Sequence, residues 1–306
     1  MTYGFSLIMR GADATRDGFL QIAQRAEALG IDALFCSSHI VLPPQEKSGY
    51  IMVPGRKYAE HWKEGYWEPF AVIGFLAGQT RRITLGTSIT VLPMHNPFEI
   101  AKQVAEVDQL TGGRFVFGIG VGWFAEEFEV LGQDFHTRGA RTDDALALMQ
   151  ALWSQEPVTY EGRFYRVREA WFSPKPVQRP HPPIWVAGHS QATLRRAARF
   201  ADAYHPVRPT LDELPGLRRD LRGYVEAAGR APDSVQLAVK LPLVFQDGPP
   251  GAGQLPTEGR PRDIVDGVRR YRDAGAQQFL FDFVPEKLPV ALDTMERFAQ
   301  EVRPKL

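Results

Sequence analysis

Residues 110–141 read LTGGRFVFGIGVGWFAEEFEVLGQDFHTRGAR, and the strand near the start of this stretch decides the fold. Arg114–Val121 is an almost continuous apolar run, which is typical of a strand buried on both faces in a parallel sheet. Side chains alternate along a strand, so Gly118, Gly120 and Gly122 fall on one face. The opposite face presents bulky side chains, namely Phe115, Phe117, Ile119 and Val121.

The bare face of this strand has two explanations. Glycine weakens a strand interior, so glycines at every second position indicate that something else approaches closely, and a flat ligand ring is the natural candidate. The alternative is a tight barrel core that needs small residues. The spacing alone leaves both explanations open.

The same glycines fit a dinucleotide-binding pattern only in part. Gly120, Gly122 and Ala125 satisfy G-x-G-x-x-G/A. That fingerprint expects an acidic residue at the end of the next strand, roughly 20 residues further on. Asp143 and Asp144 are near that distance but belong to a helical pattern. The sequence therefore gives a Rossmann fold little support.

Composition limits the classes of partner. The chain has 306 residues, 44% hydrophobic content and 36 basic against 36 acidic residues, so we expect a large core and no nucleic-acid or anionic-membrane partner. The first residues lack the segments of a signal peptide, and no run reaches the roughly 18 apolar residues of a membrane span. The single Cys36 excludes an intramolecular disulfide. We expect a cytoplasmic protein that acts on small molecules.

Apolar periodicity predicts eight strands, each followed by a helix. The strands are expected at Tyr3–Met9, Asp32–Cys36, Ile83–Thr90, Arg114–Val121, Ile184–Ala187, Ala203–His205, Val235–Phe245 and Phe279–Val284. The alternation is that of an α/β protein with a (β/α)₈ or TIM barrel, which typically takes about 250 residues. We therefore predict one domain over residues 1–306, with insertions after strands two and four.

The two insertions are expected at about 41–68 and about 123–182. The first lacks periodicity and is rich in Pro, Gly, Tyr and Trp, which favours an ordered lid. The second contains a predicted hairpin with strands at Val158–Tyr160 and Phe164–Val167.

Active sites of such barrels lie at the carboxyl ends of the strands. His39 follows the second strand, so it is either a proton donor or cofactor contact, or a structural histidine held by loop backbone, and its position favours function. The turn Gly188, His189 and Ser190 opens a helix and can hold a phosphate, unless Ser190 is simply the N-cap of an ordinary helix. The first strand has no histidines, and we predict no metal site.

Three longer segments share their order and spacing with a known family. They are ITLGTSITVLPMHNPFEIAKQVAEVDQLTGGRFVFGIGVGWFAEEFEVLG, RGARTDDAL and FSPKPVQRPHPPIWVAGHSQATLRRAARFADAYHP. They resemble the luciferase-like monooxygenases, and most closely the branch of probable coenzyme F420-dependent oxidoreductases, from Met1 to about Gly229. The resemblance implies a barrel with insertions that binds an isoalloxazine or deazaflavin ring at the strand ends. Expected cofactor contacts are His39, Thr87, Ser88, Ile89, Gly120, Gly122, Gly188, His189 and Ser190.

The resemblance also bears on single positions. It implies a non-prolyl cis peptide at Ser88–Ile89, behind the ring. Sugar-phosphate-oxidising deazaflavin relatives carry Glu and Asn at the positions of Trp123 and Glu126, which argues against sugar-phosphate chemistry. Many relatives have Asp in place of Ser38. We predict His39 and Glu126 as the catalytic residues.

Three functions follow as hypotheses. The first is hydride transfer between coenzyme F420 and a small organic substrate. The second is a two-component monooxygenase that takes reduced FMN (FMNH2) from a separate reductase and reacts with O₂. The third is a barrel that binds flavin without turnover. We expect a small-molecule substrate, a separate flavin or F420 reductase, and a homodimer.

Overall fold

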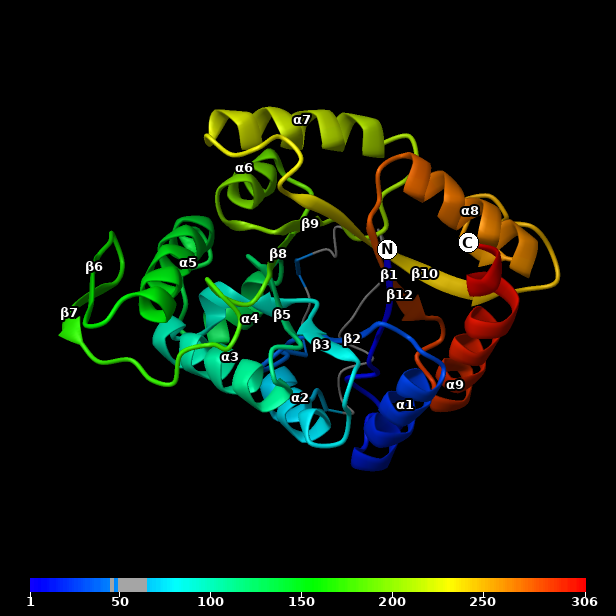
Figure 1. Ribbon diagram of the computed structural model, residues 1–306, viewed down its shortest axis with the longest axis horizontal. Coiled ribbons are helices and arrows are strands. Elements are labelled where there is room, and N and C mark those ends of the chain that lie inside the picture. The colour runs from blue at the N-terminus through cyan, green and yellow to red at the C-terminus, as the bar shows by residue number, and fades with distance from the viewer. Residues whose placement is uncertain (45–46, 49–64) are drawn as a thin grey trace.

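The computed structural model describes residues 1–44, 47–48 and 65–306, and within them eight parallel strands close into a barrel (Figure 1). In ring order the strands are β1 (Thr2–Ser6), β2 (Ala33–Cys36), β3 (Thr84–Thr87), β5 (Phe115–Gly120), β8 (Ile184–Ala187), β9 (Ala203–His205), β10 (Gln236–Phe245) and β12 (Gln278–Phe283). The pairing of β9 with β10 and of β12 with β1 closes the ring. The predicted barrel fold is confirmed.

Helices surround this ring and follow the strands in order (Figure 1). They are α1 (Arg16–Ala28), α2 (Pro69–Ala77), α3 (Pro97–Thr111), α5 (Arg138–Ser154), α6 (Gln191–Phe200), α7 (Leu214–Ala227), α8 (Pro261–Asp273) and α9 (Leu288–Arg297), with the short α4 (Ala125–Val130) before α5. Local signals set the limits of α1: the Thr15 side chain accepts a hydrogen bond from the Gly18 amide, and Gly30 follows with φ +69°.

Two apolar layers hold the barrel together. Large side chains such as Phe5, Phe117 and Phe281 point outward and are buried under the helices. A smaller cluster fills the interior, where the rings of Phe35 and Trp185 stack with centroids 4.8 Å apart. This interior packing makes the barrel a filled core and leaves the carboxyl ends of its strands, here called the mouth, for a site.

The third strand differs from the sequence prediction. Instead of one strand over Ile83–Thr90, β3 ends at Thr87, the Ser88–Ile89 peptide is cis, and β4 (Thr90–Val91) resumes pairing with β5. The Thr87 hydroxyl donates to the Gly118 carbonyl (2.7 Å) and accepts from the Gly118 amide (3.0 Å). The Thr87 side chain thus bonds to the backbone groups of Gly118, which would pair with the backbone of the neighbouring strand in a regular sheet.

The hairpin is also displaced from its predicted position. Its strands are β6 (Val158–Glu161) and β7 (Arg166–Ala170), and the second begins two residues later than predicted. The reason is Asp144, whose carboxylate accepts the amides of Phe164 (2.5 Å) and Tyr165 (3.1 Å). Those amides are therefore not available for pairing with β6.

The insertions agree with the sequence analysis only in outline. Residues 45–46 and 49–64, most of the predicted lid, lie outside the described residues. The predicted insertion 123–182 includes α5, which is one of the helices around the barrel, so the additions are the segments before and after it. A further inserted segment, which contains β11 (Glu258–Gly259), lies between β10 and α8 and was not predicted. Among the described residues, no helix combines the length and apolar character needed to cross a bilayer.

Candidate active site

The glycines of β5 are explained by the neighbouring strand. A Cβ on Gly118 would lie 2.0 Å from the Thr87 carbonyl oxygen, and one on Gly120 would lie 2.8 Å from Cδ1 of Ile89. Real Cβ atoms do not approach backbone so closely, so a larger residue is excluded at Gly118, whereas at Gly120 it would require the end of the Ile89 side chain to move. Of the two explanations left open by the sequence, close packing of the barrel wall accounts for these glycines without a ligand.

Gly122 has its own reasons. Its φ of +80° lies in the left-handed region that favours glycine, and a Cβ there would lie 2.6 Å from Cγ1 of Val91. Its carbonyl accepts a hydrogen bond from Nε of Arg138 (3.3 Å). Contacts of Gly120 and Gly122 with a cofactor therefore stay predictions, because packing against Ile89 explains Gly120 and the positive φ explains Gly122 without a ligand.

The cis peptide predicted from the resemblance is present at Ser88–Ile89. Ile89 packs against a small apolar cluster that contains Val91 and Met94. Ser88 is buried and its hydroxyl lies 3.0 Å from Nε2 of His205. The three consecutive residues predicted to contact the cofactor thus differ in direction, since the Thr87 side chain faces the barrel wall whereas Ser88 faces the interior.

His39 has a buried carboxylate as its partner. Its Nδ1 lies 2.7 Å from Oε2 of Glu127, a residue with no exposed surface. The other oxygen of Glu127 accepts the amides of Ile40 (2.7 Å) and Val41 (3.3 Å). Glu127 therefore holds both the imidazole and the backbone that follows it, and it joins the end of β2 to α4.

The neighbouring Glu126 is the glutamate predicted from the sequence as catalytic. Glu126 accepts the amides of Lys47 (2.5 Å) and Ser48 (2.8 Å) and the Ser48 hydroxyl (2.6 Å). Burial raises the pKa of Glu126, but these hydrogen bonds outweigh that effect and leave the pKa below its ordinary value. Its carboxylate secures the loop, and Glu127, which the sequence analysis missed, is the one that contacts His39. An acid/base role for Glu126 stays a prediction.

Two more charged residues at the mouth were missed. The Nζ of Lys240 on β10 lies 3.3 Å from Oδ1 of Asp282 on β12, and the Ser6 hydroxyl donates to the same oxygen at 2.6 Å. The signal was present in the sequence, because each charge interrupts an otherwise apolar strand, LAVKLPLVF and FLFDF. Neither residue is the last of its strand, so a search limited to strand ends does not find them.

The turn after β8 has the features expected of a phosphate-binding loop. Gly188 has φ +137°, and a Cβ on it would lie 2.7 Å from Oγ1 of Thr193. The Ser190 hydroxyl accepts the Thr193 amide (3.2 Å), so Ser190 is the N-cap of α6. Burial lowers the pKa of His189, and the charge of Glu213 partly opposes this. Apart from the capped Thr193 amide, the first amides of α6 have no carbonyl partner within the helix, and amides in such a position are suited to an anion.

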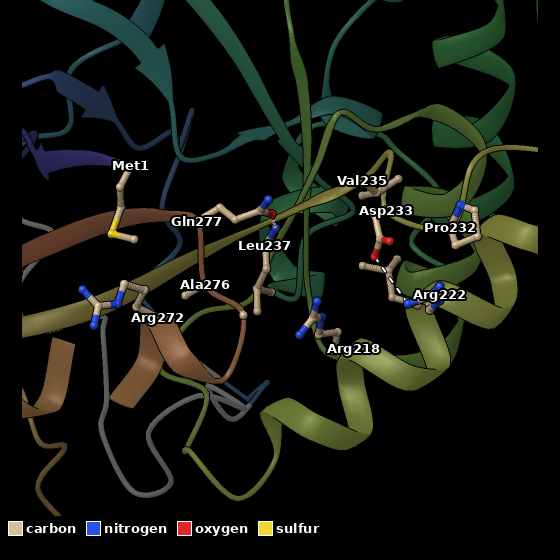
Figure 2. A pocket seen from close by; sticks show the side chains of 12 residues that line it. Met1, Arg218, Arg222, Pro232, Asp233, Val235, Leu237, Arg272, Ala276 and Gln277 are labelled. Carbon is tan, nitrogen blue, oxygen red and sulfur yellow. Dashed lines mark hydrogen bonds and ion pairs between the residues drawn. The ribbon is translucent and has the colours of Figure 1, made fainter. Parts of the chain in front are cut away.

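A cavity of about 400 Å³ lies at the other end of the barrel (Figure 2). Its lining includes Val235 and Leu237 from the start of β10, Gln277 just before β12, and Arg222, which lies 3.6 Å from Asp233. These positions mark the amino ends of the strands, where barrel residues serve stability rather than catalysis. The cavity is therefore not the candidate active site.

No group of three or more His, Cys, Asp or Glu side chains in the described part of the chain could hold a metal ion. The described residues do, by contrast, provide two features that suit an organic cofactor. These are a glycine turn at the start of a helix and ionisable side chains around the mouth. The residues present are therefore compatible with a phosphate-bearing ring cofactor.

Comparison with known proteins agrees with this geometry. The model of a family described as luciferase-like monooxygenase matches residues 3–278. The FMNH(2)-dependent dimethylsulfone monooxygenase of Pseudomonas putida is 29% identical over 207 residues, which is 66% of this chain and 56% of that protein.

Two solved structures have the same fold over nearly the whole chain. The monooxygenase RslO1 from Streptomyces bottropensis has a TM-score of 0.81 at 21% identity and covers 99% of both chains. An F420-dependent secondary alcohol dehydrogenase in complex with an F420-acetone adduct has a TM-score of 0.78 at 18% identity, over 99% of this chain and 98% of that one. Likeness at this level of identity establishes the fold alone.

Proposed function

The chain belongs to the luciferase-like monooxygenase family, and from that premise we propose that it transfers hydride between coenzyme F420 and a small organic substrate. The observation that carries the proposal is the pair of His39 and Glu127 at the mouth. Hydride transfer to or from a polar bond, such as that of an alcohol or carbonyl, needs a proton to move as well, and a positioned histidine is the usual side chain for this task.

Glu127 prepares His39 for proton transfer. Its carboxylate, 2.7 Å from Nδ1, fixes the orientation of the ring. Nε2 is then the atom that exchanges a proton with the substrate. Bound F420 would supply the hydride for a reduction, or accept it in an oxidation, at C5 of its deazaflavin ring. Both steps together make a two-electron oxidation or reduction.

The predicted cofactor contacts support this assignment in two places. The turn Gly188, His189 and Ser190 offers amides at the start of α6 for the phosphate of the cofactor. The Ser88–Ile89 cis peptide lies where the resemblance implies support for the ring. Neither feature distinguishes F420 from FMN, because both cofactors carry a tricyclic ring and a phosphate.

The second candidate function is an FMNH2-dependent monooxygenase with O₂ as co-substrate. It is favoured by the Pseudomonas putida relative, whose name states FMNH2 dependence and which is 29% identical over 207 residues. A separate reductase would then supply the reduced flavin. A small-molecule substrate is common to both functions.

Titration of the apoprotein with F420 and with FMN, each oxidised and reduced, tests the assignment. We expect F420 to bind and to exchange hydride with a member of an alcohol and carbonyl panel, without O₂ uptake. Binding of FMN alone, with O₂ consumption and a flavin C4a-peroxide absorbance, would replace the proposal by the second function. Tight binding without turnover across the panel would favour a non-catalytic flavin-binding barrel.

A further inference from the structure

Polar side chains occupy a layer of the barrel interior that is usually apolar. Interior positions of such barrels are dominated by branched apolar residues. Here Ser6, Ser88, His205 and Asp282, at or next to the carboxyl ends of their strands, meet Lys240 from the middle of β10. The side chains of Lys240 and Asp282 are 13% and 30% exposed, so this layer borders the mouth.

The hydrogen bonds within this layer form a series in which each group donates to the next, from Lys240 through Ser88 and His205 to the Ala238 carbonyl. Nδ1 of His205 lies 2.6 Å from the Ala238 carbonyl, so this nitrogen carries the proton and donates it. Burial lowers the pKa of His205 to about 4, so the ring is neutral at pH 7 and Nε2 accepts from the Ser88 hydroxyl. The Ser88 oxygen is left to accept from Nζ of Lys240 (3.4 Å). Because the series ends at a backbone carbonyl, it positions Lys240 and does not relay protons.

The ammonium of Lys240 can donate a hydrogen bond to one more partner. It has three N–H donors, and among the described residues its partners are Asp282 at 3.3 Å and Ser88 at 3.4 Å. Charge-assisted N–H···O bonds are usually about 2.7–2.9 Å long, so both contacts are loose. An ammonium at the mouth with loose contacts and a remaining donor is suited to an anionic oxygen or nitrogen of a ligand.

We propose that Lys240 binds the pyrimidine end of the cofactor ring and stabilises the negative charge that this end acquires on reduction. The inference rests on the proposed function and deepens it. Its support is the contact of Lys240 with Ser88, one of the two residues of the cis peptide expected behind the ring. Flavins and deazaflavins share the N1–C2=O edge, and charge placed near N1 is a known means of tuning such rings.

The test compares cofactor affinity in two oxidation states. Lys240→Met keeps the length of the side chain and removes its charge. We expect the Kd of the reduced cofactor, measured anaerobically, to rise about tenfold more than that of the oxidised cofactor, because hydrogen bonds to charged groups are worth about 1.5–3 kcal/mol. That ratio corresponds to a fall of about 30 mV in the midpoint potential of the bound two-electron couple. Lys102→Met, on α3, is the matched control and should leave both Kd values unchanged.

Two further variants keep the inference testable if Lys240→Met does not fold. Lys240→Arg retains the charge and should retain the preference for the reduced cofactor. Asp282→Asn removes the opposing charge and should increase that preference. Equal losses in both oxidation states, an unchanged ratio in Asp282→Asn, or a rise in substrate KM alone would overturn the inference, and the last would assign Lys240 to the substrate. A wild-type protein that binds neither F420 nor FMN would instead refute the proposed function itself.

Discussion

The two sides of the barrel mouth are built in different ways. The glycine side, formed by β3, β5 and β8, has backbone atoms and aliphatic side chains packed against residues that lack a Cβ. The charged side, formed by β10, β12, β1 and β2, carries Lys240 with Asp282 and, just beyond the strands, Arg10 with Glu286 at 2.5 Å. The glycine side therefore presents closely packed backbone and apolar atoms, whereas the charged side presents ionisable side chains.

The pair of His39 and Glu127 joins the two sides. His39 follows β2, whereas Glu127 lies on α4, which follows β5. Glycine in this barrel therefore marks close contact between strands, while ionisable groups are brought together from distant parts of the chain. A flat ring between the two sides would have backbone on one face and ionisable groups on the other.

The largest effect is expected at the junction of the two sides. His39→Ala should lower the single-turnover rate by about 10² to 10⁴-fold, because it removes a positioned proton donor, and it should leave cofactor affinity near the wild-type value. Both quantities are measured in the same variant, with His136→Ala at an exposed position as control. Full activity with native affinity would make His39 a structural residue.

On the glycine side, Gly118→Ala should reduce the free energy of unfolding by about 3 kcal/mol, because the new Cβ would meet a backbone carbonyl that cannot move aside. Gly74→Ala in α2 is the control, since no described atom lies within 4 Å of its Cβ position. There we expect a gain of up to about 1 kcal/mol from helix propensity. Urea unfolding of both variants checks the contrast, and similar values for the two would contradict the packing explanation of β5.

Acid should lower the free energy of unfolding through the buried side chain of His205. Burial lowers the pKa of His205 to about 4 from 6.5, so between these values the unfolded chain binds a proton that the folded chain does not. Stability is therefore full above pH 6.5 and falls by about 3 kcal/mol as the pH drops to 4. The half-buried His95, whose pKa is lowered to about 4 by desolvation, acts in the same direction.

Measurement of the free energy of unfolding from pH 7.5 to 4 checks this effect. His205→Gln should flatten the profile, and His136→Ala should not. An unchanged slope in His205→Gln would show that other groups cause the loss of stability.

The smallest effect is expected at the phosphate turn. Gly188→Ala should weaken cofactor binding about tenfold, or about 1.4 kcal/mol, because its φ of +137° and the contact with Thr193 would force the turn to shift. Gly229→Ala is the matched control, since Gly229 has φ +74° and no described atom near its Cβ position. Calorimetric titration measures both variants, and equal affinities would argue against a phosphate at this turn.

The barrel and the order of its elements could be predicted from the sequence. Strand and helix periods are local patterns, and so are the cap at Thr15 and the glycine at Gly30, which is why most elements lie where the pattern predicts them. The family resemblance also predicted the cis peptide at Ser88–Ile89. The position of His39 directly after a predicted strand indicated that it lies near the mouth.

Tertiary structure alone decided which side chains meet. The choice between Glu126 and Glu127 depends on how α4 is turned toward β2, and His39 and Glu127 are 88 residues apart. Lys240 and Asp282 become neighbours only when β10 pairs with β12. The glycines of β5 receive their explanation from the interrupted third strand. Local patterns depend on the backbone of one element, whereas a site depends on the relative rotation of several, and that is fixed only when the barrel closes.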